Sequence, residues 1–480
     1  MKNSEELRQQ LRSINRKSYP AYKGLKGLYH FGNYILSIDH VQGDPFASPS
    51  HVSIQISHRD AGFPVEYYKD TLTGTTLCDY LTRQFEKQVS QYSFRAKGSG
   101  KSGLLTASHC GQEILSRTAC EITEKGITAR FFVGFPANGR TINATELEKI
   151  LFDFLPVCIQ KSFFYSSLNA KELQNYIELA EDQEFIRQTL PAKNLCAFIA
   201  DGSILPRESG ISSRPMKASI PFTSPDSLRI SINLPHKGKI TGMGIPKGIT
   251  LIVGGGYHGK STLLNALELG VYNHIPGDGR EYVITDATAV KLRSEDGRFI
   301  KDVDISMFIN DLPNKKDTRC FSTLDASGST SQAAGIVESM EAGSHLFLLD
   351  EDTSATNFMV RDAFMQQVIQ REKEPITPFL ERAEDLYKKA GISTILVAGS
   401  SGAFFHIADT IIQMDNYVPK DITASVKKLC SQYPLPAVSV TDFQLPHSHR
   451  IMSRPAESLS ASYITVVEII PIPVPQNLSA

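Results

Sequence analysis

Apolar residues recur along the chain with two kinds of spacing, and each predicts a type of element. Near the start, Leu7, Leu11 and Ile14 recur every three to four residues, as on one face of a helix. The same spacing returns from 144 to 190, where Asn143 or Thr145 is expected to cap the first helix. The apolar positions there are Leu147, Ile150, Leu151 and Phe154 on one face, and Leu173, Tyr176, Ile177 and Leu179 on another.

Short continuous apolar runs predict buried strands. They lie at 127–136, 249–253, 344–350 and 394–398, and in the first run we expect both Phe131 and Phe132 to pack in a core. Helical stretches lie at 263–267 and 333–342, so that residues 195 to about 425 alternate strand and helix. This alternation predicts an α/β fold.

The turn after the strand at 249–253 matches the phosphate-binding pattern G-x-x-x-x-G-K-[ST] without a mismatch. Glycines allow backbone N–H groups to surround phosphate oxygens, Lys260 adds a positive charge, and the Ser261 hydroxyl can ligate Mg²⁺. A strand that leads into a helix amino terminus also favours an anion there. The pattern predicts a site for ATP and Mg²⁺, formed by Gly254, Gly255, Gly256, Tyr257, His258, Gly259, Lys260, Ser261 and Thr262.

Two adjacent carboxylates, Asp350 and Glu351, end the strand predicted in residues 344–351. We expect Asp350 to hold Mg²⁺ and Glu351 to orient and polarise the attacking water. An apolar strand that ends in acids is common, so the pair indicates a nucleotide site only in combination with the loop that carries Lys260.

A stretch rich in Ser and Gly, residues 326–332, indicates the class of P-loop protein. Ser327 lies 23 residues before Asp350, and the helix predicted between them leads into the strand that carries the acids. This order resembles the ATP-binding cassette (ABC) class, in which a signature Ser-Gly opens such a helix. Residues 352–357 resemble the loop that follows the catalytic carboxylate in that class.

The phrases at 42–46, 200–207 and 276–281 extend the resemblance through most of the chain, to the soluble ABC-class ATPase family of bacteria and some protists. The resemblance implies a P-loop ABC-type ATPase core with a separate mixed α/β N-terminal domain. It also implies a homodimer, closing with ATP, in which Ser327, Gly328 and Ser329 of one subunit face the γ-phosphate on the other. A serine hydroxyl and helix amides are suitable donors to phosphate. Capping of the helix by Ser327 or Thr330 is the alternative role.

The sequence departs from the ABC pattern where a histidine usually contacts the γ-phosphate. After the strand at 394–398 the chain has Gly, Ser, Ser and Gly at 399–402. Ser400 or Ser401 can hydrogen-bond phosphate or water, but neither can carry the charge of imidazole. His406 lies nearby, and we expect it to pack within a helix.

Two further departures concern the metal and the signature. No glutamine that senses Mg²⁺ is evident, and Asn310 or Asp311 is the expected substitute. The signature has Ser329 and Thr330 in place of Gly-Gln. These differences put the rate of turnover in question more than nucleotide binding.

The composition favours a globular protein with two or three domains, because 480 residues, 41% of them hydrophobic, exceed a single core. No run of about 18 apolar residues and no apolar signal core is present, so we expect no membrane span and a cytoplasmic location. The 7 cysteines have no C-x-x-C spacing, which favours a reducing compartment and no zinc site.

Positive charge is concentrated in the first third of the chain. Residues 1–140 hold 18 basic and 12 acidic side chains, whereas the whole chain holds 50 and 51. Basic groups neutralise phosphates and aromatic rings stack on bases, so we expect a surface for RNA or another single-stranded nucleic acid. Its members are Arg83, Lys87, Arg95, Lys97 and Lys101 among Tyr92 and Phe94, with Arg130 and Arg140 as weaker additions. A solvated charged face is the alternative. The glycine turn at 98–102 is no second P-loop, because Arg95 stands where the first glycine is required.

These patterns divide the chain into four parts. We predict a mixed α/β N-terminal domain at 1–150, a helical connector at 151–194, an ABC-type ATPase core at 195–430, and a segment rich in Pro and Ser at 431–480. His447 and His449 in the last part have no Cys, Asp or Glu at ligand spacing, so we expect an exposed tail there.

The sequence thus indicates an ATPase that couples ATP-driven closure to the binding of a polyanion, with RNA as the expected polymer. The expected catalytic residues are Glu351, Lys260 and Ser400. A nucleotide-gated module that binds RNA or protein with negligible turnover is the main alternative, favoured by the missing histidine. An energy subunit of a transporter would need a membrane partner, and a small-molecule kinase would need an acceptor site that the sequence does not display.

Overall fold

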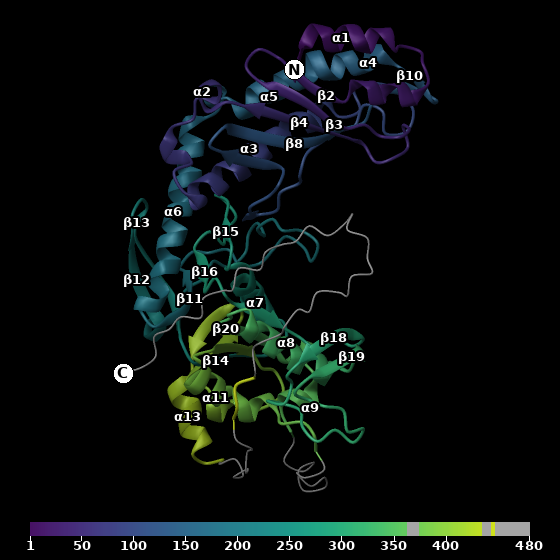
Figure 1. Ribbon diagram of the computed structural model, residues 1–480. Coiled ribbons are helices and arrows are strands. Elements are labelled where there is room, and N and C mark those ends of the chain that lie inside the picture. Colours follow the sequence, from purple (N-terminus) through teal and green to yellow (C-terminus); the bar gives the residue numbers. More distant parts are fainter. Residues whose placement is uncertain (362–373, 434–442, 447–480) are drawn as a thin grey trace.

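A computed structural model of the chain describes residues 1–361, 374–433 and 443–446. It has two lobes (Figure 1), one around a seven-stranded sheet and one around a six-stranded sheet. Two connections join them. One is the long helix α6 (Ala170–Ala192), and the other is the pairing of β6 (Glu113–Ile114) with β15 (Asn273–His274).

The N-terminal sheet has the strand order β1-β2-β3-β4-β8-β5, and β7 also pairs with β8. Its strands are β1 Lys2–Asn3, β2 Gly27–His30, β3 Ile35–His40, β4 Ser50–Ile56, β5 Leu105–Thr106, β7 Cys120–Thr123 and β8 Gly126–Val133. Side chains alternate between a buried and an exposed face along β4 and β8, because successive residues of a strand point to opposite sides.

Helices α3 (Thr71–Tyr92) and α5 (Leu155–Phe163) pack on the buried face. The ring of Phe85 in α3 lies 5.1 Å from the ring of Phe131 in β8 and 5.1 Å from that of Phe163 in α5. A π-helical turn at 149–154 joins α5 to α4 (Ala144–Glu148).

The predicted helical patterns are confirmed. Leu7 and Leu11 are buried on α1 (Ser4–Ser13). Asn143 is the cap of α4, where its side chain accepts a hydrogen bond from the Glu146 amide at 3.4 Å.

The expectation that Phe131 and Phe132 both pack in the core is wrong for Phe132. Phe131 is buried, but the side chain of Phe132 is 40% exposed. The run at 127–133 is a strand of a sheet with one open face, so its alternate residues point outward. A run of apolar residues alone does not show whether the second face is covered.

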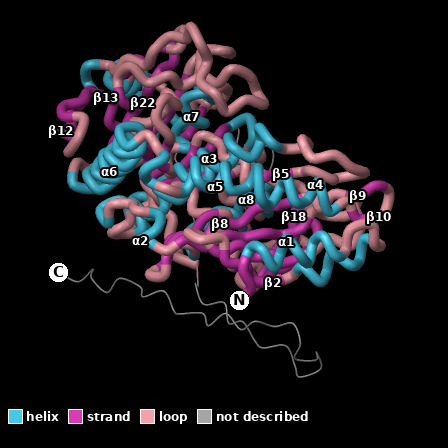
Figure 2. The backbone as a smooth tube through the Cα atoms, turned by 90° about the horizontal axis from the view of Figure 1, so that it is seen from above, coloured by secondary structure: helices cyan, strands magenta, loops and turns pink. Residues whose placement is uncertain are grey.

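Helix α6 contributes to two cores. Leu173 and Ile177 pack in the N-terminal core, whereas Ile186 and Leu190 pack under an antiparallel sheet of order β12-β13-β11-β16. Figure 2 shows α6 beside β12. The strands are β11 Leu195–Ala200, β12 Arg229–Leu234, β13 Gly238–Pro246 and β16 Val283–Thr285.

The second lobe is built on a sheet of order β17-β20-β21-β14-β22-β23, in which only β23 is antiparallel to its neighbour. Its strands are β14 Ile249–Val253, β17 Val290–Leu292, β20 Leu346–Asp350, β21 Ser393–Val397, β22 Thr410–Asp415 and β23 Val418–Asp421. Helix α7 (Lys260–Leu269) packs with the face that carries Ile252, and α8 (Gly328–Glu341) and α11 (Phe379–Ala390) pack with the face that carries Leu251. Coverage of both faces explains why β14, β20 and β21 are buried along their whole length.

The remaining α-helices and strands are short. They are α2 His58–Ala61, β9 Ala137–Asn138, β10 Thr141–Ile142, β18 Arg298–Val303, β19 Phe321–Ala326, α9 Thr356–Met359, α12 Phe404–Ile407 and α13 Thr423–Cys430. No helix in the described ranges is both long and apolar enough to cross a bilayer. His447 and His449 lie outside the described residues.

A buried ion-pair cluster fastens the N-terminal lobe to β6. The Asp79 carboxylate of α3 has a side-chain exposure of 0% and pairs with the Arg83 guanidinium at 2.6 Å and with Arg117. Arg83 also donates to the carbonyl oxygens of Gly111 and Glu113, at 2.6 and 3.0 Å. Arg83 therefore acts inside the structure, and it is not part of an open basic surface as predicted.

We expect Asp79→Ala to destabilise the protein by about 3–5 kcal/mol, because two buried guanidinium groups lose their counter-charge. Denaturant unfolding followed by circular dichroism measures the change. The control is Asp153→Ala, at an exposed aspartate of the same lobe, which should stay within about 0.5 kcal/mol of the wild type. Equal unfolding midpoints for the two variants would show that the cluster contributes no net stability.

Candidate nucleotide site

The phosphate-binding pattern forms the turn between β14 and α7. All five residues of β14 are buried, and α7 begins at Lys260. Gly254 has φ +145°, and a Cβ there would lie 2.4 Å from the carbonyl oxygen of Met414. Glycine is required at this position because the turn passes so close to the backbone of β22. The first amides of α7 follow directly after this loop and have no partner within the helix.

Lys260 lies across the inside of this loop. Its ammonium group donates to the carbonyl oxygens of Gly254 and Gly255, at 2.7 and 2.8 Å. Tyr257 points into solvent with an exposure of 98%. His258 instead faces the turn after β22, where its Nδ1 accepts a hydrogen bond from the Asn416 amide at 2.9 Å. Tyr257 and His258 were both predicted to bind the nucleotide, but His258 instead holds the loop against the β22–β23 hairpin.

The acidic pair lies at the same edge of the sheet as the loop. Val397 at the end of β21 is in register with Asp350 on one side and with Ile252 on the other. Neighbouring strands lie about 4.8 Å apart, so the ends of β14 and β20 are roughly 10 Å apart. The P-loop, residues 399–400 and the acidic pair therefore leave three adjacent strands at one level.

Asp350 is almost buried, with an exposure of 7%. Burial raises the pKa of its carboxyl group above the usual range, and the Asp352 charge acts in the same direction, whereas Lys291 and Lys260 oppose the rise. Its only recorded side-chain contact among the described residues is a 3.3 Å hydrogen bond from the Asp352 amide. The Asp350 carboxylate can therefore accept further hydrogen bonds or bind a cation.

Glu351 has the opposite environment. Its carboxylate accepts hydrogen bonds from the amides of Gly399 and Ser400, at 2.7 and 2.9 Å, and from the Ser400 hydroxyl. Burial alone would raise the pKa of Glu351, but the Ser400 side chain and these amides outweigh it and hold the pKa below its usual range. Glu351 is thus an ionised carboxylate fixed by the segment that replaces the expected histidine.

The signature stretch opens α8. Ser327 is the residue before this helix, but its hydroxyl makes no capping hydrogen bond and instead lies 3.0 Å from the Thr330 hydroxyl. Ser329 is nearly buried and donates to Asn357 Oδ1 at 2.8 Å. The alternative role of Ser327 as a side-chain cap is not seen.

Gln332 connects the signature helix to the acidic pair, a link that the sequence analysis missed. Its Oε1 accepts from the Ala355 amide at 2.9 Å, and its Nε2 donates to the Ser354 hydroxyl at 3.0 Å. Ser354 in turn donates to the Asp350 carbonyl oxygen at 2.9 Å. The position of this glutamine directly before the apolar residues 333–337 of α8 was the signal that could have identified it.

Two family models match the chain. Residues 169–448 match the family model of the P-loop domain of the ABC ATPases, and residues 4–166 match that of the N-terminal domain of ATPases of the ABC class. The chain belongs to the family of ABC-class ATPases. The predicted fold class, a P-loop ABC-type core with a separate mixed α/β N-terminal domain, is confirmed.

Individual relatives of this ABC-class ATPase cover only parts of it. It is 31% identical over 266 residues to the uncharacterized protein MJ1628 of Methanocaldococcus jannaschii, a match that covers 52% of this chain and 58% of the relative. The chain therefore spans less than two thirds of that protein.

Two solved structures of transporter components are also similar to this ABC-class ATPase. An ATP-binding cassette of an ABC transporter, MJ1267 in its ADP conformation, is 13% identical with a TM-score of 0.27, over 40% of this chain and 88% of that one. A bacterial Atm1-family ABC exporter with ATP bound is 14% identical with a TM-score of 0.28, over 51% and 43%.

Several other residues that the sequence suggested for metal or nucleic-acid binding in this ABC-class ATPase make contacts within the protein itself. The Asn310 amide group donates to the Ser306 carbonyl oxygen at 2.6 Å and so closes a turn. His406 lies in the short helix α12, half-buried as expected. In the N-terminal lobe the Arg95 guanidinium stacks on the Tyr92 ring, 4.8 Å from its centre, and Arg130 pairs with Glu121 at 2.7 Å.

We expect Ser400→Ala to raise the pKa of the Glu351 carboxyl group, because the carboxylate loses a hydrogen bond that stabilises its ionised form. A depressed pKa means protonation only at low pH, so the variant should become protonated at a higher pH than the wild type. Carbon NMR of selectively labelled glutamate, assigned with Glu351→Gln, measures the titration. Ser401→Ala keeps the backbone donors and should leave the titration unchanged. An identical titration in Ser400→Ala would contradict the role of this hydroxyl.

Proposed function

We propose that this ABC-class ATPase binds ATP with Mg²⁺ at the loop 254–262 and hydrolyses it. The main support is the alignment of three strand ends, which brings the P-loop, residues 399–400 and the acidic pair to one edge of the sheet. The amides of Gly259 to Thr262 and the charge of Lys260 are suited to the phosphates of the nucleotide. Lys260 would exchange its contacts with loop carbonyls for phosphate oxygens.

The donor set of this edge fits a magnesium ion. The Asp350 carboxylate has unused acceptor capacity, and burial raises the pKa of its carboxyl group although Lys291 and Lys260 oppose the rise. No hydrogen bond of the Ser261 side chain is recorded within the described part of the chain, and this side chain is exposed. Hydroxyl and carboxylate oxygens are the ligands that Mg²⁺ prefers. When bound, the ion would neutralise charge on the phosphate oxygens.

In this proposal Glu351 orients the attacking water and accepts its proton. The lowered pKa keeps the carboxylate ready as an acceptor at neutral pH. Ser400 acts through Glu351 as a positioning residue, because its hydroxyl contacts that carboxylate directly. This assignment refines the expectation that Ser400 itself contacts phosphate or water.

We further propose that two copies close on ATP. Ser327, Gly328 and Ser329 of one copy would then contact the phosphates held by the other. The Ser327 hydroxyl supports this role because no backbone group of its own helix uses it. Ser329 is nearly buried and engaged with Asn357, so it would act through the helix amides and not through its hydroxyl.

The N-terminal lobe is proposed to bind a single-stranded nucleic acid, with RNA as the expected polymer. His40, His51 and Phe132 are paired residues on β3, β4 and β8 and form a row of exposed rings. The centres of His40 and His51 lie 5.3 Å apart, and those of His51 and Phe132 lie 5.1 Å apart. Exposed rings on an open sheet face can stack on unpaired bases, and the excess of basic side chains in residues 1–140 favours phosphates.

A module that binds its partner in a nucleotide-gated manner, with negligible turnover, is the second candidate. The observation that favours it is the absence of a histidine at 399–402, where Ser400 is occupied with Glu351. Such a module would bind ATP and close, but release phosphate very slowly. Single-turnover measurement of phosphate release distinguishes the two.

We expect Glu351→Gln to retain ATP binding and to lower kcat on the order of 10²- to 10⁴-fold, because the amide cannot accept the proton of water. Lys260→Ala should lose ATP binding, because its ammonium group compensates the phosphate charge. Equilibrium binding and phosphate release measure both effects. Lys239→Ala, at an exposed lysine of β13, is the control and should resemble the wild type. Hydrolysis at the wild-type rate in Glu351→Gln would refute the assignment of the base.

We expect homopolymeric RNA to stimulate ATP hydrolysis, and added salt to weaken this stimulation steeply because phosphate contacts release counterions. Phe132→Ala should reduce RNA affinity by about 1–3 kcal/mol, the usual contribution of one stacked base. Phe185→Ala, at a similarly exposed ring on α6, should have no effect. If no nucleic acid changes the rate at any salt concentration, the partner is of another class.

A further inference from the structure

A cavity of about 860 Å³ opens beside the P-loop. Its first wall is the exposed side of α7 from Thr262 to Leu269, and its second is the segment 205–222, which we call the wall segment. Met414 and Tyr417 of the β22–β23 hairpin form the third. Helix α7 rises about 1.5 Å per residue, so the cavity extends roughly 10 Å from Thr262 along this helix.

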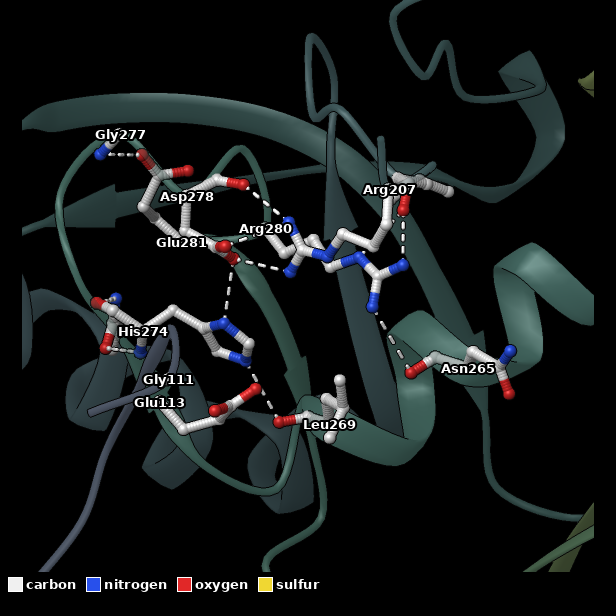
Figure 3. A network of polar contacts seen from close by, with 12 residues as sticks. Gly111, Glu113, Arg207, Asn265, Leu269, His274, Gly277, Asp278, Arg280 and Glu281 are labelled. Atoms are coloured by element: carbon white, nitrogen blue, oxygen red, sulfur yellow. Dashed lines mark hydrogen bonds and ion pairs between the residues drawn. The ribbon is translucent and has the colours of Figure 1, made fainter. Parts of the chain in front are cut away.

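The wall segment is held in place by a buried polar network (Figure 3). Arg280 donates to the Leu205 carbonyl oxygen at 2.8 Å and to that of Asn265 in α7 at 3.5 Å. Arg207 pairs with the Asp278 carboxylate at 2.9 Å, and His274 contacts the same carboxylate at 2.8 Å. Burial, with help from the Arg207 charge, lowers the pKa of Arg280 to about 10.

This network lies at the end of the cavity away from the P-loop, which we call the far end, and its charges affect which part of a ligand can bind there. Asp278 compensates the charge of Arg207, and Arg280 is nearly buried and directs its donors at main-chain oxygens. Leu205, Met216 and Phe222 contribute apolar surface to the wall segment. Glu113 and Glu268 also line the cavity, and their carboxylates disfavour a phosphate there, so phosphates belong at the end next to the P-loop.

Tyr417 lies where these two ends meet. A Cβ built on Gly259, the last glycine of the P-loop, would lie 2.9 Å from Cδ1 of Tyr417, so the ring rests directly on the loop. Half of the side chain, 50%, is exposed. Its hydroxyl has no recorded hydrogen bond within the described ranges. The ring is thus open on the side of the cavity.

The backbone that carries the Tyr417 ring has an uncommon conformation. Asn416 and Tyr417 both have positive φ, 46° and 68°, as in the tight turns that join antiparallel strands. An aromatic residue is uncommon in this conformation, which glycine would adopt more easily. The Tyr417 amide donates to the His258 carbonyl oxygen at 3.2 Å, and the Asn416 amide donates to the His258 ring. The P-loop and the hairpin thus fix each other.

We propose that this cavity takes the nucleoside half of the nucleotide, and that the Tyr417 ring stacks on the base. The proposal rests on the proposed function, because the phosphates must lie on the P-loop for the base to reach Tyr417. Continuity of the cavity with Gly259 and Thr262, the open face of the ring and the apolar surface of the wall segment support it. Tyr417 is then a binding residue contributed by the hairpin after the last parallel strand.

Removal of the ring should weaken binding of ATP but not of its phosphate chain alone. Tyr417→Gly suits the positive φ, so it removes the ring with little strain on the turn. We expect its ATP affinity to fall about 10-fold, in the range of one lost stacking contact, with Tyr417→Phe close to the wild type. Affinity for magnesium tripolyphosphate should be equal in all three proteins. Calorimetric titration measures both ligands.

The outcomes separate this proposal from the proposed function. If Tyr417→Gly binds ATP as the wild type does while Lys260→Ala loses both ligands, the base lies elsewhere and the P-loop assignment stands. If Lys260→Ala keeps both ligands, the nucleotide site itself is wrong. A parallel loss of ATP and tripolyphosphate in Tyr417→Gly would show that the ring only supports the loop.

A spectroscopic test uses the absence of tryptophan from the whole sequence. Tyr417→Trp introduces a single indole, whose fluorescence a stacked base should quench. We expect quenching by ATP and none by tripolyphosphate. Tyr433→Trp, at an exposed tyrosine that does not line the cavity, is the control and should respond to neither. Equal responses of Tyr417→Trp to ATP and tripolyphosphate would overturn the stacking proposal.

Discussion

The parallel pairing of β20, β21 and β14 is the constraint on which the rest of the site depends. Strand register places Ile252, Val397 and Asp350 at one level, so the segments that follow them emerge side by side. Each segment supplies a different chemical group: amides and a lysine from the P-loop, hydroxyl and amide donors from 399–400, and two carboxylates from 350–351. A shift of one strand by a single residue would turn its side chains to the other face and separate these groups.

Within this frame, two neighbouring carboxylates acquire different properties. Asp350 is nearly buried with one weak hydrogen bond, and the pKa of its carboxyl group is raised. Glu351 receives donors from Gly399 and Ser400, and its pKa is lowered. The difference arises from the surroundings of the two acids, because burial dominates at Asp350 whereas the donors of Ser400 and Gly399 outweigh burial at Glu351. It is consistent with separate roles in metal binding and in water activation.

The two lobes are joined by polar contacts as well as by α6. The Arg83 guanidinium, compensated by Asp79, holds the carbonyl oxygens on both sides of Gln112, and the adjacent β6 pairs with β15. On the other side, Gln183 of α6 exchanges two hydrogen bonds with the backbone of His274, at 2.9 and 3.1 Å. His274 also contacts the Leu269 carbonyl oxygen at the end of α7 at 3.0 Å. The N-terminal domain is thus connected, through buried groups, to the helix that begins at the P-loop.

The sequence by itself determined the features whose residues are contiguous. The P-loop pattern, the acids after an apolar run and the Ser-Gly before a helix are local, because a strand, a turn and a helix start together define each of them. The contact of Ser400 with Glu351 joins residues 49 apart, and that of Asn416 with His258 joins residues 158 apart. Only the tertiary structure decided these contacts, the internal role of Arg83 and the outward position of Phe132. They depend on strand register, on a hairpin turn and on which sheet face is covered, and these follow from the packing of the whole chain rather than from any short stretch of it.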